Sequence, residues 1–230
     1  MSALATSPLL WLAVTLLVFE AADTLSRRSN RHPLLHPVLW AAPVLMAILL
    51  VSGTPYPTYA AATWMLGFLL GPATVALAVP LWRARAIVRK AAWPLAAALL
   101  AGSVTAAASA VGIVWAFGAP DTLLASAAPR ATTTPVAMAL SQQLGGIPSL
   151  TAAIVLMSGI FGAMIVTPLF NAMRIRDFRA RGFAAGVSAH GFGTARAFQV
   201  DALGGTFAGV GMAMNAATTA LLLTLWAVLV

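Results

Sequence analysis

Apolar stretches follow one another along almost the whole chain, separated by short polar or basic segments. A helix that crosses the hydrocarbon core of a bilayer needs about 20 predominantly apolar residues. Six segments are predicted to cross: Leu9–Ala22, Leu34–Val51, Ala60–Trp82, Ala91–Phe117, Ile147–Met173 and Leu203–Val230. The pattern therefore predicts an all-α, polytopic transmembrane helix bundle.

Two further segments are apolar but carry many polar residues. Ala131–Gly146 is short and rich in Thr, Ser and Gln, and Gly182–Val200 is broken by Ser, His, Gly, Thr and Arg. We expect the first to enter and leave the membrane on the outer side and the second on the inner side, as discontinuous half-helices. Six full crossings then remain, with both termini outside, whereas the competing count lets one or both segments cross fully. Weak similarity between residues 73–78 and 131–138 suggests an internal repeat of inverted topology.

Composition strengthens the assignment to membranes. Of the 230 residues, 61% are hydrophobic and only 8% are charged, so a soluble domain of this chain could not cover itself with polar surface. The length suits one compact bundle, and we expect a single transmembrane domain over residues 1–230.

The net charge of +8 would suggest a nucleic-acid partner if the basic residues formed a patch on a soluble domain. Instead, eleven of the 13 Lys and Arg fall in three short runs, at residues 27–31, 83–90 and 174–181, each at the end of an apolar segment. Loops of this kind stay in the cytoplasm under the positive-inside rule. We therefore expect a multi-pass membrane protein with no nucleic-acid partner, a retained first helix and an external loop at Gly118–Pro129.

Polar or irregular backbone at membrane depth survives only when it is buried in protein or lines a wet cavity. Three stretches of this kind mark the predicted working centre: Leu70–Ala78, which contains Thr74, Ala131–Met138 and Ser188–Ala197. In the second, Thr132, Thr133 and Thr134 precede a proline, which predicts hydroxyl caps at the start of a half-helix whose free N–H groups attract an anion. The alternative is a Thr-rich external turn that merely caps a helix.

Arg196 is the most informative residue of the third stretch. A lone arginine in a bilayer needs a partner, and a planar guanidinium matches a carboxylate well. We predict that it binds a substrate carboxylate, unless it pairs with Asp201 or reaches the interface. His190 could carry a coupling proton or lie in a packed turn. The other candidate substrate-binding residues are Ser188, Gly191, Gly193, Thr194 and Asn215, although Asn215 also suits an interhelical hydrogen bond.

Other chemistries find little support in the sequence. There is no cysteine and there are three histidines, two of them in a basic loop, so we expect no metal centre. Gly191 and Gly193 lack the third glycine and the preceding strand of a dinucleotide site, and no cofactor is expected. We also expect no enzyme, because the Ser, Thr and His residues stand isolated from one another.

Three motifs in order resemble the LrgB/CidB family. They are Leu69-Leu-Gly-Pro-Ala-Thr-Val-Ala-Leu-Ala-Val-Pro-Leu81; Thr132-Thr-Thr-Pro-Val-Ala-Met138 with Gly145-Gly-Ile-Pro-Ser149; and Arg174-Ile-Arg-Asp177 followed by Ser188-Ala-His-Gly-Phe-Gly-Thr-Ala-Arg196. The resemblance covers essentially the whole chain.

Two functions follow from this resemblance. Bacterial members are named as antiholin-like modulators of murein hydrolases and autolysis that act with a small holin-like membrane partner. A plant plastidal relative is a glycolate/glycerate transporter, and some bacterial pairs are implicated in pyruvate uptake. The resemblance favours transport of small 2-hydroxy or 2-oxo monocarboxylates across the bacterial inner membrane, with coupling to protons as a further expectation. We expect a homodimer because the protein is a small transporter. Many members carry an acidic residue at the position of Ala139, so a carboxylate proton relay is in doubt here and His190 is the main titratable candidate.

Overall fold

The computed structural model describes residues 7–229 except 77 and 84, and only the backbone of residues 33, 70, 71, 73, 74, 78, 80, 81 and 229. The described residues are helical and contain no strand, which confirms the predicted all-α class. They divide into two compact units, residues 1–78 and 79–230, each of which is described by itself. The expectation of a single domain stays a prediction.

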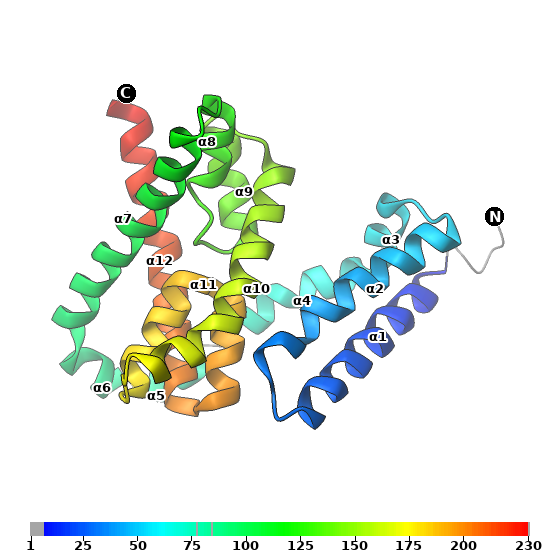
Figure 1. The fold of residues 1–230 in the computed structure, drawn as a ribbon, viewed down its shortest axis with the longest axis horizontal. Helices are drawn as coiled ribbons and strands as arrows, with labels where there is room; N and C mark the ends of the chain where they lie inside the picture. The colour runs from blue at the N-terminus through cyan, green and yellow to red at the C-terminus, as the bar shows by residue number, and fades with distance from the viewer. Residues whose placement is uncertain (1–6, 77, 84, 230) are drawn as a thin grey trace. The chain divides into compact units, whose positions relative to one another are not determined.

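The first unit is built on a helical hairpin (Figure 1). It contains α1 (Pro8–Arg28), the short 3-10 helix η2 (Pro33–Leu35), α2 (Pro37–Ser52), α3 (Tyr56–Ala62) and α4 (Trp64–Ala76). The α1 helix packs against α2 and α3, where Thr15 Oγ1 lies 3.0 Å from the Tyr59 hydroxyl. At its end, Arg27 pairs with Glu20 and Arg31 pairs with Asp23, so the acidic residues of α1 are partners of the first basic run.

The second unit contains long helices and segments that turn back (Figure 1). Its helices are α5 (Ala78–Arg83, whose first residue belongs to the other unit), α6 (Arg85–Lys90), α7 (Ala92–Ala116), α8 (Asp121–Ala127), α9 (Thr134–Gln143), α10 (Pro148–Ala172), α11 (Phe178–Val200) and α12 (Ala202–Leu229). Proline stands in the first turn of α9 and of α10, where its fixed φ suits a helix and its missing N–H is not needed.

Four helices of the described residues are long and apolar enough to cross a membrane: α1, α7, α10 and α12. The pair α2 and α3, bent by 117° at its break, would make a fifth. The expectation of six full crossings stays a prediction, because the predicted third crossing, Ala60–Trp82, includes residue 77, which lies outside the described residues. The predicted second crossing, Leu34–Val51, corresponds to η2 and α2, and Gly53, with a φ of 62°, ends α2. The predicted third begins in α3 and continues into α4.

The α11 helix reverses direction at a kink. Ala189 and His190 have non-helical backbone angles, with φ of +40° and ψ of −125° at His190. A Cβ on Gly193 would overlap the carbonyl oxygen of Ala185, although residues eight apart in a continuous helix lie about 12 Å apart. The two halves of α11 thus fold back on each other, as predicted for a re-entrant segment.

Glycines allow α12 to pack directly on the first half of α11. A Cβ on Gly182 would overlap the carbonyl oxygen of Gly204, and one on Gly186 would overlap that of Ala208. Since the contact positions increase by four residues along both helices, the first half of α11 and α12 run parallel. The second half of α11 therefore returns to the end from which the first half started, and α12 then crosses.

The outer segment also turns back, but with different limits from those predicted. The region Gly118–Pro129, predicted as an external loop, contains α8, and its last residues, Ala127, Ala128 and Pro129, are buried. After α9, Ile147 N–H donates to Ser126 Oγ at 2.8 Å, which brings the end of this segment back to α8. Residues 121–133 form one limb of the re-entrant segment, and α9 forms the other. The polar tip between them is buried in protein, because lipid offers it no hydrogen-bond partners.

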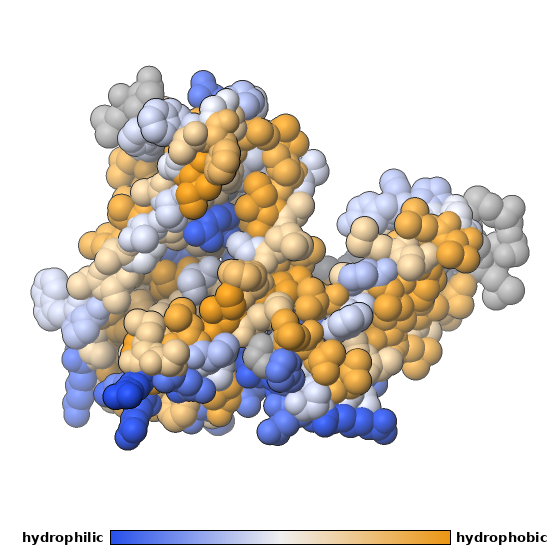
Figure 2. All heavy atoms as spheres, viewed as in Figure 1, coloured by the Kyte–Doolittle hydropathy of each residue, from blue (hydrophilic) through white to orange (hydrophobic). Residues whose placement is uncertain are grey.

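Two hydrophobic clusters hold the second unit together near its opposite ends. One joins Leu95, Leu99, Phe183, Val187, Phe207 and Val210, and the other joins Ala128, Leu140 and Leu223. Lys90 and Arg179 line a common depression with Leu203, so the second and third basic runs lie at the same end. Figure 2 shows hydrophilic residues gathered at that end and mostly hydrophobic residues along the flank, the distribution expected for a bundle in lipid.

Candidate functional site

The tips of the two re-entrant segments meet at Asn215. Its side-chain amide donates to the carbonyl oxygen of Ala131 at 2.8 Å, in the outer tip, and to that of Val187 at 3.2 Å, in the inner one. Its Oδ1 accepts from Ser103 Oγ at 2.7 Å and from Thr219 Oγ1 at 3.3 Å. Asn215 is fully buried, and these four bonds use both of its N–H donors and both oxygen lone pairs. It therefore joins the tips to α7 and α12.

His190 fixes the inner tip against α10. Its Nε2 lies 3.2 Å from the carbonyl oxygen of Val155, and its ring centroid lies 5.7 Å from that of Phe192. The side chain is buried, and a Cβ on Gly159 would come within 2.5 Å of it. Glycine at position 159 thus makes room for the imidazole, and the same turn of α10 faces the outer tip through Ser158, whose hydroxyl lies 3.5 Å from the Arg130 carbonyl oxygen.

The three threonines lie where the outer tip becomes α9, but they do not all act as predicted. Thr134 begins the helix and Thr133 is its N-cap residue, which makes no side-chain capping bond. The fully buried Thr132 donates from Oγ1 to the Pro129 carbonyl at 2.9 Å. The predicted half-helix start is confirmed. The predicted hydroxyl cap is wrong, because Thr133 makes no capping bond and the Thr132 hydroxyl closes the preceding turn.

The predicted residues on α11 separate into two groups. Thr194 is buried, with Oγ1 2.8 Å from the His190 carbonyl oxygen, and Gly193 is buried against Ala185. Both lie in the packed hairpin. Ser188, by contrast, is exposed and donates to the Ala184 carbonyl of its own helix at 2.7 Å, and Gly191 is exposed with open space around it. Side chains predicted to form one site thus face both the interior and the surface of the unit.

Arg196 lies away from the tips, near the basic end of α10. Its Nε donates to Thr167 Oγ1 at 3.3 Å, and its guanidinium also reaches Gln199 Oε1 at 3.4 Å. Thr167 follows Ser158 by nine residues, which is about 14 Å along a helix. The guanidinium is buried and engaged with protein groups.

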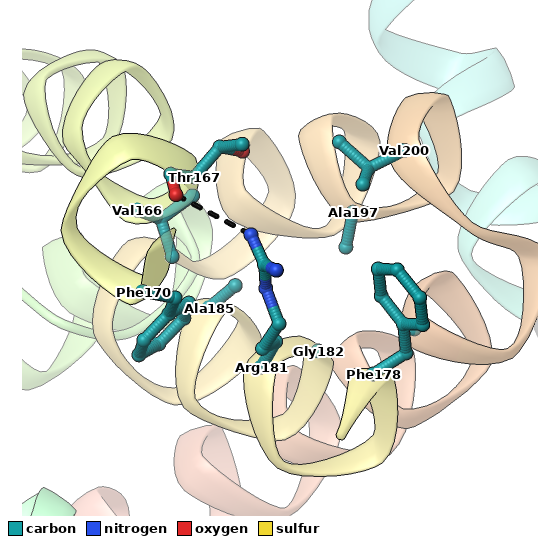
Figure 3. A pocket seen from close by; sticks show the side chains of 10 residues that line it. Val166, Thr167, Phe170, Phe178, Arg181, Gly182, Ala185, Ala197 and Val200 are labelled. Carbon is teal, nitrogen blue, oxygen red and sulfur yellow. Dashed lines mark hydrogen bonds between the residues drawn. The ribbon is translucent and has the colours of Figure 1, made fainter. Parts of the chain in front are cut away.

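A second arginine, which the sequence analysis missed, shares this threonine. Arg181 points into a small cavity between α10 and α11 and donates to the Thr167 carbonyl at 3.3 Å (Figure 3). It also donates to Asn171 Oδ1 at 2.8 Å and lies over the rings of Phe170 and Phe178. The cavity measures about 20 Å³, which is room for about one water. As a member of the third basic run, Arg181 gave no separate signal in the sequence.

Thr74, which was predicted, and Arg130, which was not, are the remaining residues to be placed. Thr74 lies in α4, and its side chain is outside the described residues. Arg130 was overlooked, although subtraction would have found it: it and Arg196 are the two basic residues that fall in none of the three runs. Arg130 lies in the outer tip, between α8 and α9.

An ion pair between Asp177 and Arg179 lies at the N-terminus of α11. Asp177 is the N-cap and accepts from the backbone N–H of Arg179 at 2.9 Å, and the Arg179 guanidinium also donates to its carboxylate. The guanidinium, and then this backbone bond, lower the pKa of Asp177 below its ordinary value of 3.8. Asp177 therefore stays ionised and suits the positive end of the helix.

The fold and the junction define an α-helical, multi-pass membrane protein with two re-entrant segments whose tips meet inside one unit. The chain belongs to the LrgB-like family, whose model matches residues 15–229.

Relatives in bacteria match nearly the full chain. The uncharacterized proteins YwbG and YxaC of Bacillus subtilis (strain 168) are each 34% identical, over 90% and 88% of this chain and 92% and 89% of their own lengths. Holin-like protein CidB of Staphylococcus epidermidis is 27% identical over 93% of each chain. No solved structure matches.

Proposed function

We propose that this protein carries a small organic anion across the bacterial inner membrane. One observation carries the proposal: two half-helices, α9 and the second half of α11, both begin at tips that Asn215 joins. Transporters built on discontinuous helices place their substrate sites where such breaks meet. In this proposal the junction is the place where substrate crosses between the two re-entrant segments.

The sign of the charge favours an anion. Half-helices that begin at the junction direct the positive ends of their dipoles toward it. Arg196, which is buried, and Arg130 and Arg181, which are half-buried, add positive charge to the same unit. A carboxylate is the partner that a guanidinium matches best.

For the substrate, we propose small 2-hydroxy or 2-oxo monocarboxylates such as glycolate, glycerate, lactate or pyruvate. The resemblance to the plant plastidal transporter supports this class. Arg196 holds the carboxylate on its way to the inner side, and His190, buried at the kink beside Val155, carries a coupling proton. The protein is then a carrier and not an enzyme, and a homodimer is its expected form in the bilayer.

A second candidate is a holin-like or antiholin-like role in autolysis, together with a small holin-like partner. The CidB relatives are named holin-like proteins, and this name favours the second candidate over carboxylate transport. A protein of this kind needs no substrate of its own, so it tolerates loss of the Arg196 guanidinium as long as the fold survives.

Proteoliposomes that contain the purified protein separate the two candidates. Uptake of labelled glycolate, lactate and pyruvate is measured with and without a pH gradient, beside release of a trapped fluorescent dye too large for a carboxylate carrier. Arg196→Gln and Arg196→Lys are compared with Arg176→Gln, because Arg176 is exposed in the loop between α10 and α11.

A carrier gives saturable uptake without dye release, and Arg196→Gln lowers that uptake at least tenfold while Arg176→Gln leaves it unchanged. Dye release without saturable uptake supports the holin-like role. No uptake from folded protein, even with a holin-like partner added, sinks the transport proposal.

A further inference from the structure

Arg130 is fixed at the outer tip by its own backbone. Pro129 and Ala131, its neighbours, are buried. The Ala131 carbonyl accepts from Asn215 at 2.8 Å, and the Arg130 carbonyl lies 3.5 Å from the Ser158 hydroxyl. The side chain of Arg130 therefore starts from a held position between α7 and α10.

The guanidinium of Arg130 keeps most of its hydrogen-bonding capacity. It has five N–H donors. Among the described residues it makes a single hydrogen bond, to Ser109 Oγ on α7, at 3.5 Å and therefore at the limit for such a bond, and it forms no ion pair. The side chain is half-buried, so water can satisfy only part of it.

The other interior arginines differ from Arg130 in this respect. Arg181 bonds both Thr167 and Asn171 at 2.8 to 3.3 Å and lies against two aromatic rings. Arg196 bonds Thr167 and Gln199 and is buried. These two guanidinium groups make several contacts with protein groups at the inner end of α10, whereas that of Arg130 makes one long hydrogen bond at the tip.

We propose that Arg130 binds the carboxylate of the substrate at the outer tip, with its guanidinium paired to both carboxylate oxygens and the Ser109 hydroxyl beside them. This inference rests on the proposed function. Arg130 is placed at the level of Ser158 and Arg196 at that of Thr167, about 14 Å further along α10. One small carboxylate cannot reach both arginines, so they serve successive positions on the path, Arg130 the outer and Arg196 the inner.

The test compares Arg130→Gln and Arg130→Lys with wild type and with Arg176→Gln, which removes an equal charge from an exposed loop. The melting temperature of the purified protein is measured without ligand and with pyruvate or glycolate. The KM for uptake of the same compounds is measured in proteoliposomes. Lysine keeps the charge but loses the planar, two-pronged geometry of arginine.

We expect Arg130→Gln to raise the KM at least tenfold and to abolish the rise in melting temperature that the carboxylate causes. Its melting temperature without ligand is expected to stay the same or to rise, because a poorly satisfied charge is removed. Arg130→Lys gives an intermediate KM, and Arg176→Gln behaves as wild type.

Other outcomes overturn the inference in distinguishable ways. Uptake by wild type together with an unchanged KM in Arg130→Gln removes Arg130 from substrate binding and leaves the transport proposal standing. If folded wild type neither takes up nor binds any carboxylate, the transport proposal and the role of Arg130 are both refuted. If Arg130→Gln lowers the melting temperature without ligand, Arg130→Lys decides. Lysine restores both the melting temperature and the KM to wild-type values if the cation is purely structural, whereas the KM stays above that of wild type if Arg130 binds the carboxylate.

Discussion

Replacement of Asn215 by alanine tests whether one amide holds the two re-entrant tips together. The change removes four buried hydrogen bonds, to Ser103, Ala131, Val187 and Thr219. At an average of about 0.6 kcal/mol for such bonds in a membrane protein, they account for about 2.4 kcal/mol. The carbonyl groups of Ala131 and Val187 also lose a donor inside the protein, which costs about 1 kcal/mol or more for each group.

We therefore expect Asn215→Ala to lower the free energy of unfolding by about 3 to 5 kcal/mol. Reversible unfolding in mixed micelles, followed by circular dichroism, measures this quantity. Thr219→Ala is the matched control on the same helix, because it removes only the 3.3 Å bond to Asn215 and is expected to cost about 1 kcal/mol or less. Met214→Ala, at an exposed neighbouring position, controls for truncation on the lipid-facing side.

A double-mutant cycle with Ser103→Ala separates one of the four bonds from the others. The 2.7 Å contact between Ser103 Oγ and Asn215 Oδ1 predicts a coupling energy of about 0.5 to 1.5 kcal/mol. The reasoning is refuted if Asn215→Ala costs no more than Thr219→Ala, since the tips would then be held by packing alone.

Three further predictions concern the hairpin of α11. The free energy of unfolding of His190→Gly should exceed that of His190→Ala by about 1 to 2 kcal/mol. Both variants lose the bond to Val155, but only glycine adopts the φ of +40° without strain. Equal free energies of unfolding would contradict a strained kink. Gly186→Ala should cost about 2 kcal/mol or more in the same assay, because its Cβ would overlap the Ala208 carbonyl, whereas Gly112→Ala, with open space at its Cβ, should not destabilise. Asp177→Ala should cost about 1 kcal/mol near pH 6 through the lost N-cap, with Asp177→Asn costing less. Since Arg179 lowers the pKa of Asp177, this stabilisation exists above pH 3.8 and disappears as the pH falls through the lowered pKa. A difference in stability between wild type and Asp177→Ala that persists at pH 2 would show that the ionised carboxylate is not its source.

Much of the architecture could be predicted from local pattern. The long apolar runs that became α7, α10 and α12 are visible without any partner, because lipid forces backbone groups to bond within the helix. The half-helix start at Thr134 and Pro135 and the break near His190 also follow from residue type, since proline suits a first turn and polar, glycine-rich segments do not form ordinary crossings. The positions of the basic runs indicated which loops share an end.

Contacts between distant segments could not be predicted. The joint role of Asn215 depends on Ala131 and Val187, 84 and 28 residues away, and no period or spacing encodes such a pairing. The same limit applies to Arg196, for which the sequence suggested a free carboxylate site and the structure provides Thr167 and Gln199. Arg130, like Arg196, is a basic residue outside every run, but only its placement at the outer tip gave that signal a meaning.

By itself, the sequence determined that the chain is an α-helical membrane protein of this family, which loops are basic and where two helices break, because these properties arise from transfer of each segment into lipid and from local backbone preference. The tertiary structure alone decided that the breaks meet, that Asn215 joins them, and which guanidinium groups are held by protein. Those features depend on how segments far apart in the chain satisfy one another's buried polar groups, and that is settled only when the helices pack.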